Sequence, residues 1–105
     1  MMFRCWPVRL ERGWAMGIEI ELSRTHLAIL STPQGYLMCG ALDVKLLDER
    51  LAAREIVAGR ALVVKSVADL LEAPLDSVTK AARAVGLRDG MSGRDAGNVL
   101  LGLSE

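Results

Sequence analysis

The stretch GYLMCGALD at residues 35–43 decides how this chain folds, because an apolar, strand-like run ends within it and an amphipathic helical pattern begins after its aspartate. Upstream, Thr32–Gly35 supplies turn chemistry, and the apolar run Leu27–Ser31 precedes that turn. Two apolar runs joined by a tight turn predict a β-hairpin whose strands are covered on both faces. The alternating pattern of Trp14–Leu22 predicts a further strand. We expect its apolar, even-numbered face to be buried and its odd-numbered face to be exposed to solvent.

Downstream of residue 43 the pattern turns helical. Asp43 can accept the free amide hydrogens of a first helical turn, and Val44, Leu47 and Leu51 recur on one face of the helix that would follow. The run Ala61–Val64 is long enough only for a short strand.

Cap signals mark the later helices. Ser66 opens a brief helix that ends near Ala73, Pro74 suits the first turn of a helix that stops at Gly86, and Ser92 opens the last helix.

These patterns predict an α+β fold in one compact domain spanning residues 1–105. Residues 1–41 form a β-rich part with antiparallel strands, and residues 42–105 form a mixed part with three to four helices and one short strand. A content of 51% hydrophobic and 25% charged residues suits a compact domain. A chain of this size buries roughly two thirds of its extended surface on folding, so association with other copies would add stability.

The quoted stretch, continued through Ile56–Ala61 and Gly86–Arg94, resembles the signature of the YunC-like family, small bacterial and archaeal proteins of unknown function. The similarity is close from about Gly35 to Asp95. The resemblance implies no established catalytic residues. It does imply that an N-terminal β region mediates assembly into a homotetramer, so we expect residues 1–41 to be the oligomerisation region.

Charge and cysteine content narrow the classes of function. Thirteen basic and thirteen acidic residues cancel, which argues against nucleic acid as a partner. The two cysteines, Cys5 and Cys39, lack metal-ligand spacing, so we expect no metal and no cofactor, and the reducing cytoplasm fits them best. No apolar run approaches the roughly 20 residues that span a bilayer, so we expect neither membrane insertion nor secretion.

A first candidate site is the strand-to-helix junction at Cys39, Gly40 and Asp43. Amide hydrogens at the start of a helix could hold an anion there or activate the Cys39 thiol. In the alternative interpretation, which we favour, Cys39 packs as a small apolar residue, Gly40 allows close packing and Asp43 is only a helix cap.

The hairpin geometry gives Cys39 a possible partner. If the turn centres between residues 33 and 34, Cys39 lies opposite Ala28 and diagonal to His26, the only histidine of the chain. His26 could then activate the thiol for nucleophilic catalysis. One more residue in the turn would put the two side chains on opposite faces.

A second candidate site is the loop Arg88–Arg94. Its backbone amides, with Arg88 or Arg94, could form an anion-binding concavity. The alternative is a structural connection in which Ser92 caps the last helix. We favour that alternative because the loop lacks the spacing of a phosphate loop.

A third candidate is an interface near the N-terminus. Three of the four aromatic residues, Phe3, Trp6 and Trp14, fall within the first fourteen positions. Tryptophan is enriched at interface cores, so we expect these residues, with Met16, to lie in a contact between subunits. In the alternative, the tryptophans fold back onto their own core.

The sequence favours a small cytoplasmic homo-oligomeric domain that acts as a binding or interaction module, with copies of itself as partners and no catalysis of its own. Two alternatives stay open. One is a thiol-dependent enzyme or redox protein that uses Cys39. The other is a subunit that binds a small anionic metabolite around Gly40 and Arg94.

Overall fold

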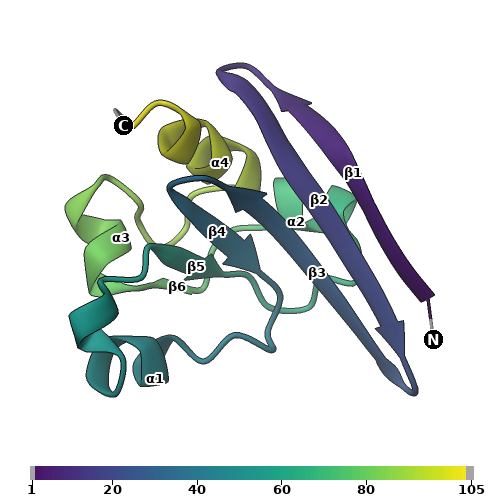
Figure 1. The fold of residues 1–105 in the computed structure, drawn as a ribbon, viewed down its shortest axis with the longest axis horizontal. Coiled ribbons are helices and arrows are strands. Elements are labelled where there is room, and N and C mark those ends of the chain that lie inside the picture. Colours follow the sequence, from purple (N-terminus) through teal and green to yellow (C-terminus); the bar gives the residue numbers. More distant parts are fainter. Residues whose placement is uncertain (1, 104–105) are drawn as a thin grey trace.

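A six-stranded mixed sheet runs through the molecule, with its strands side by side in the order in which they occur along the chain (Figure 1). The computed structural model describes residues 2–103. The strands are β1 (Met2–Leu10), β2 (Gly13–Leu22), β3 (Thr25–Thr32), β4 (Gly35–Met38), β5 (Ala58–Arg60) and β6 (Ser77–Val78). The helices are α1 (Val44–Glu49), the 3-10 turn η1 (Ala52–Arg54), α2 (Val67–Glu72), α3 (Lys80–Ala84) and α4 (Gly93–Leu101). The fold is α+β, as the sequence predicts.

The hairpin β3–β4 has the predicted register. Thr32 pairs with Gly35, so residues 33 and 34 form the turn. The Thr32 hydroxyl donates to the carbonyl oxygen of Gly35 at 2.8 Å and accepts from its amide at 3.2 Å, which holds the turn closed. The strands β1 to β4 are antiparallel neighbours, whereas β5 runs parallel to β4 and β6 antiparallel to β5.

The strand β1 lies at the edge of the sheet and pairs with β2 along its whole length, from Met2 opposite Glu21 to Leu10 opposite Gly13. Its Pro7 fits this position, because proline cannot donate a backbone hydrogen bond and is tolerated at sheet edges.

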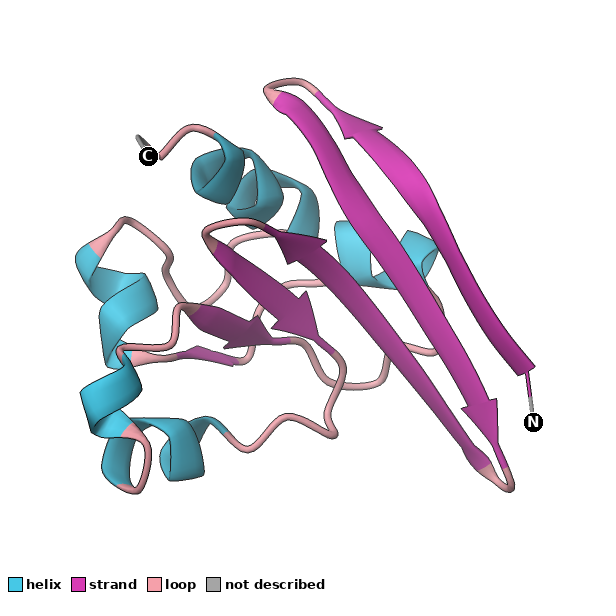
Figure 2. Ribbon diagram, in the orientation of Figure 1, coloured by secondary structure: helices cyan, strands magenta, loops and turns pink. Residues whose placement is uncertain are grey.

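The helices α2 and α4 cover one side of the sheet, and in Figure 2 they lie behind the strands. Two glycines of α4 let this helix come close to α2 and to the sheet. A Cβ atom on Gly93 would lie 1.9 Å from the carbonyl oxygen of Leu70 in α2, and one on Gly97 would lie 2.7 Å from Leu10 in β1. Gly97 is unfavourable within a helix, but it gives α4 direct access to the sheet.

The core lies between these helices and the sheet. Its largest fully buried apolar side chains, each 0% to 2% exposed, are Leu30, Leu37, Val67, Leu70, Leu87 and Leu100. A smaller buried cluster under α1 consists of Leu42, Val44, Leu47 and Ala58.

Two element predictions are wrong. The short strand is Ala58–Arg60 and not Ala61–Val64, because Gly59 packs so tightly among Leu37, Leu75 and Val78 that a side chain there would crowd them. The helix predicted to begin at Pro74 begins instead at Lys80, after the short strand β6.

Buried Thr79, only 1% exposed, explains this later helix start. Its hydroxyl donates to the carbonyl oxygen of Ile56 at 2.7 Å and accepts from the amides of Ala58 and Ala82. These bonds hold the chain extended up to residue 79 and cap α3.

Within the described residues, no helix has the length and apolarity needed to cross a membrane.

Candidate functional site

The sheet has two unlike sides, which we call the helix face and the open face. On the helix face, Gly17 of β2 packs against the side chains of Trp6 and Val8, and Glu19 accepts a hydrogen bond from the amide of Val67 at the start of α2 at 2.7 Å. Because side chains alternate along a strand, the neighbouring residues point the other way. The open face of β1–β3 is made by Phe3, Cys5, Pro7, Arg9, Trp14, Met16, Ile18, Ile20, Leu22, Thr25, Leu27, Ile29 and Ser31.

The apolar alternation of β2 points to the open face. Within the single chain the most buried residues of this strand are odd-numbered, with Ala15 4% exposed, whereas Trp14 is 59% and Met16 39% exposed. The prediction that the even-numbered face is buried is therefore wrong for the chain taken alone. The physical reason is that α2 and α4 pack on the odd-numbered side of β2, where Gly17 leaves room for the side chains of Trp6 and Val8.

The open face is apolar, although no helix within residues 2–103 covers it at β1–β3. Phe3 is 61% and Leu22 40% exposed. Among the described residues of this face Arg9 is the only charged one, and its guanidinium carbon lies 5.4 Å from the centre of the Trp14 ring. A sheet with one covered side ordinarily presents polar residues to solvent on the other side. Here the uncovered side carries apolar residues instead. Large apolar patches of this kind mark interaction sites.

The uncovered region ends where α1 begins to cover the sheet. Tyr36 pairs with Ala58, and Ile29 pairs with Met38, so these residues of β4 and β5 lie on the same side as the open face. There the cluster under α1 packs against Tyr36 and Met38. The chain thus covers this side of the sheet at β4 and β5 and leaves it bare at β1, β2 and β3.

The structure places three of the four expected interface residues on the open face: Phe3, Trp14 and Met16. It places Trp6 on the helix face, half-buried against the core, with the guanidinium of Arg4 5.6 Å from its ring centre. Trp6 therefore follows the alternative in which a tryptophan folds back onto its own core.

Cys39 and His26 are on the helix-face side but are not joined. The amide of Cys39 donates to the carbonyl oxygen of Ala28 at 3.1 Å, as the predicted turn requires. Cys39 is 4% exposed and part of the core, whereas His26 is exposed and lines a surface hollow with Glu19 and Lys65. No hydrogen bond connects the two side chains in the described part of the chain, and within residues 2–103 no cluster of three potential metal ligands occurs. This geometry favours the packing interpretation of Cys39.

The junction after Cys39 is a helix cap. The Asp43 carboxylate accepts from the amide of Leu46 at 2.9 Å, as predicted, and Gly40 is exposed next to Leu62. The helix that follows has only six residues. The geometry of the junction supports the capping role.

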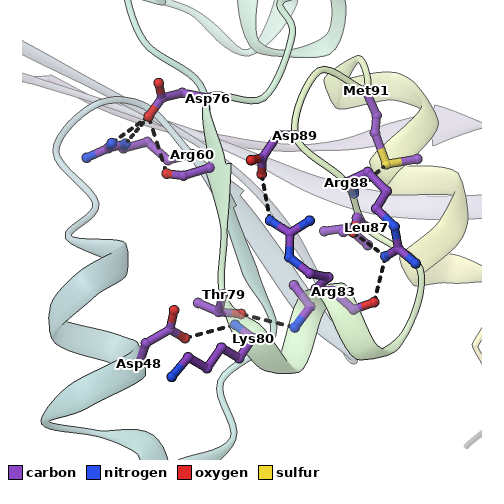
Figure 3. Close-up of polar contacts among 12 residues, drawn as sticks. Asp48, Arg60, Asp76, Thr79, Lys80, Arg83, Leu87, Arg88, Asp89 and Met91 are labelled. Atoms are coloured by element: carbon purple, nitrogen blue, oxygen red, sulfur yellow. Dashed lines mark hydrogen bonds and ion pairs between the residues drawn. The ribbon is translucent and has the colours of Figure 1, made fainter.

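The loop 88–94 uses its polar groups internally. The amides of Gly90 and Gly93 donate to the carbonyl oxygens of Leu75 and Ala73 at 2.8 and 3.1 Å, and Ser92 caps α4 by accepting from Asp95. Arg94 pairs with Glu72 at 2.6 Å. Arg88 donates to the carbonyl oxygens of Arg83 and Leu87, as Figure 3 shows. These contacts favour the structural connection over an anion site.

Arg60 joins three segments of the chain through hydrogen bonds. From β5 it donates to Asp76 at 2.5 and 3.1 Å (Figure 3). It also donates to the carbonyl oxygen of Leu42 at 3.4 Å. The hydrogen bond from Arg60 is the largest effect and lowers the pKa of Asp76 below its usual 3.8. Desolvation opposes this shift, and the positive charge of Arg60 adds to it.

These features define an α+β domain with a helix-covered sheet side and an apolar side left bare at β1–β3. The sequence profile of the domain of unknown function DUF1805 matches residues 38–99. The uncharacterized protein YunC from Bacillus subtilis (strain 168) is 45% identical over 95 residues, which are 90% of this chain and 94% of that protein. The chain therefore belongs to the DUF1805 family. The resemblance to YunC-like proteins is confirmed.

A solved structure shares the fold. The crystal structure of a protein of unknown function from Thermoplasma acidophilum superposes with a TM-score of 0.83 at 22% sequence identity, covering 94% of this chain and 93% of the other. At this identity the likeness concerns the fold. Family membership and fold leave the biochemical function unassigned.

Proposed function

We propose that this protein is a homo-oligomeric binding or interaction module, without catalysis of its own, that assembles through the open face of its sheet. The observation that carries the proposal is the bare apolar side of β1–β3, where Phe3 and Trp14 are about three fifths exposed in the single chain. Leaving such side chains in water costs roughly 1.5–3 kcal/mol each relative to full burial.

A second copy of the chain is the occupant that best fits this face. Apart from Arg9, which rests on Trp14, the face carries no charge, so two identical faces meet without repulsion. A two-fold axis brings the same patch of both subunits together. Three strands of eight to ten residues give a face about 30 Å long and about 15 Å wide. The side chains that project from this face add to its area. The total is of the same order as the ~800 Å² that each partner buries in a standard interface.

The edge strand β1 supplies a second contact and hence a tetramer. It has nine residues and no strand of the described chain on its outer side. Such an edge offers unpaired backbone groups to another copy, and a face contact combined with an edge contact generates a closed assembly of four subunits with dihedral symmetry.

The cytoplasm is the compartment that fits the cysteines. Cys5 is exposed, Cys39 is buried, and both are free thiols. Free thiols persist where glutathione and thioredoxin keep the surroundings reducing.

Native mass spectrometry of matched variants tests the proposal. We expect the wild type to be a tetramer and Trp14→Glu to fall to smaller species with an unchanged circular dichroism spectrum, because a buried unpaired carboxylate is costly. Leu46→Glu is the matched control, since Leu46 is an exposed leucine, 44%, outside the open face. A monomeric wild type, or equal masses for both variants and the wild type, would overturn the proposal.

A further inference from the structure

A cavity of about 490 Å³ lies between α1, η1 and α3, away from the open face. Its apolar lining includes Leu47, Ile56, Val57, Ala81 and Val85. This volume falls within the range of small-molecule sites, which combine an apolar lining with a few polar groups. The lining supplies such groups in Asp48, Glu55 and Lys80.

The carboxylate of Asp48 is fixed in place. One of its oxygens accepts from the backbone amide of Lys80 at 2.9 Å, which joins α1 to the start of α3 (Figure 3). The other oxygen accepts no hydrogen bond from any described residue. The ammonium group of Lys80 has no carboxylate within 4.0 Å in residues 2–103, since all four ion pairs found there involve arginine. An oriented negative group and an uncommitted positive group therefore stand beside one apolar cavity.

We propose that this cavity binds a small molecule that carries an ammonium and a carboxylate group on an apolar body, the chemistry of a hydrophobic amino acid. The ammonium group meets the free oxygen of Asp48, the carboxylate meets Lys80, and the apolar side chain lies against Leu47 and Val57. A simple fatty acid would leave Asp48 without a partner, and a simple amine would leave Lys80 without one. The proposal goes beyond assembly and does not depend on it.

Titration calorimetry with three matched probes tests the class of ligand. L-Phenylalanine carries both charges, 3-phenylpropanoate lacks the ammonium group, and 2-phenylethylamine lacks the carboxylate. We expect L-phenylalanine to bind at least about tenfold more tightly than either analogue, because a hydrogen bond to a charged group contributes about one tenfold step or more in affinity. Absence of L-phenylalanine binding at millimolar concentration, or equal affinity for the three probes, would overturn the proposal.

Two charge-neutral variants locate the site. Lys80→Gln keeps the backbone amide that holds Asp48, and Asp48→Asn keeps an oxygen that can accept from it. We expect each variant to weaken L-phenylalanine binding about tenfold. Lys65→Gln, an exposed lysine outside this cavity, is the control and should bind as the wild type does. Unchanged binding in both Lys80→Gln and Asp48→Asn would place the ligand elsewhere and overturn the assignment. Because the three-probe comparison uses the wild type alone, it tests the ligand class even if a variant misfolds.

Discussion

The two faces of the same sheet differ in how they are completed. On the helix face, Ala28, Leu30 and Leu37 are 0% exposed, because α2 and α4 of the same chain pack on them. On the open face, Phe3 and Trp14 remain about 60% exposed, although their neighbours are equally apolar. The helix face therefore stabilises the subunit itself. The open face keeps apolar side chains in water unless another copy covers them.

Neighbouring residues of β3 isolate this difference. Leu30 faces the helices and Ile29 faces the open side. We expect Leu30→Ala to lower the free energy of unfolding by about 3 kcal/mol, because it removes fully buried methyl groups and leaves a cavity. Ile29→Ala should change it by about 1 kcal/mol, and should instead weaken association of the subunits. Urea denaturation measures the two changes in unfolding free energy, and native mass spectrometry of Ile29→Ala measures the association.

Unfolding of an oligomer depends on protein concentration, so these measurements belong in the Trp14→Glu background. In that background the contribution of each face to the stability of the subunit can be measured separately. Equal losses of stability for Leu30→Ala and Ile29→Ala would mean that the two faces contribute alike to the subunit, contrary to the comparison.

The cluster under α1 sharpens the comparison, because there the chain covers its own sheet on the side of the open face. Val44 is 8% exposed in this cluster. We expect Val44→Ala to cost about 1.5–2 kcal/mol of unfolding free energy, from the loss of two buried carbon groups and partial collapse of the site. The mass of the assembly should not change. A shift to smaller species on light scattering would show that α1 takes part in the contact between subunits.

The charge pair Arg60–Asp76 should have the smallest effect, since both side chains are partly exposed. The pKa of Asp76 is lowered in the folded state, so its contribution to stability is present above pH 3.8 and is lost as the pH falls through the lower, folded-state pKa. Asp76→Asn should therefore be slightly less stable than the wild type at neutral pH and equal to it at the acid limit. Denaturation curves from pH 2 to pH 7 test this, and a difference that grows as the pH falls would contradict the assignment.

Local signals in the sequence predicted much of the fold. Asp43, Ser66 and Ser92 cap helices as expected, because a short polar side chain before an apolar run has few other roles. The turn after Thr32 set the hairpin register correctly. Non-local packing accounts for the errors. Gly59 and Thr79 determine where β5 and α3 lie through contacts with distant residues, which no local pattern records.

The candidate site was predictable only in part. The cluster of Phe3 and Trp14 near the N-terminus indicated an apolar surface, and both residues lie on the open face. The alternation in β2 could not tell which face the helices would cover. The small residues Ala15 and Gly17 were the missed signal, because small side chains in a strand leave room for close packing on that face, and Trp6 and Val8 fill the space over Gly17. The cavity beside Asp48 had no sequence signal, since its walls come from two segments that lie far apart in the sequence, 47–57 and 80–85.

The alkylation rate of Cys5 tests most directly whether the open face is covered. Cys5 lies on this face in the edge strand and is exposed in the single chain, whereas Cys39 is buried in the core. We predict slow labelling of Cys5 in the wild-type assembly and fast labelling in Trp14→Glu, with Cys39 reacting only after unfolding in both proteins. Equally fast labelling of Cys5 in both folded proteins would contradict the account, because it would show that no second copy covers the face.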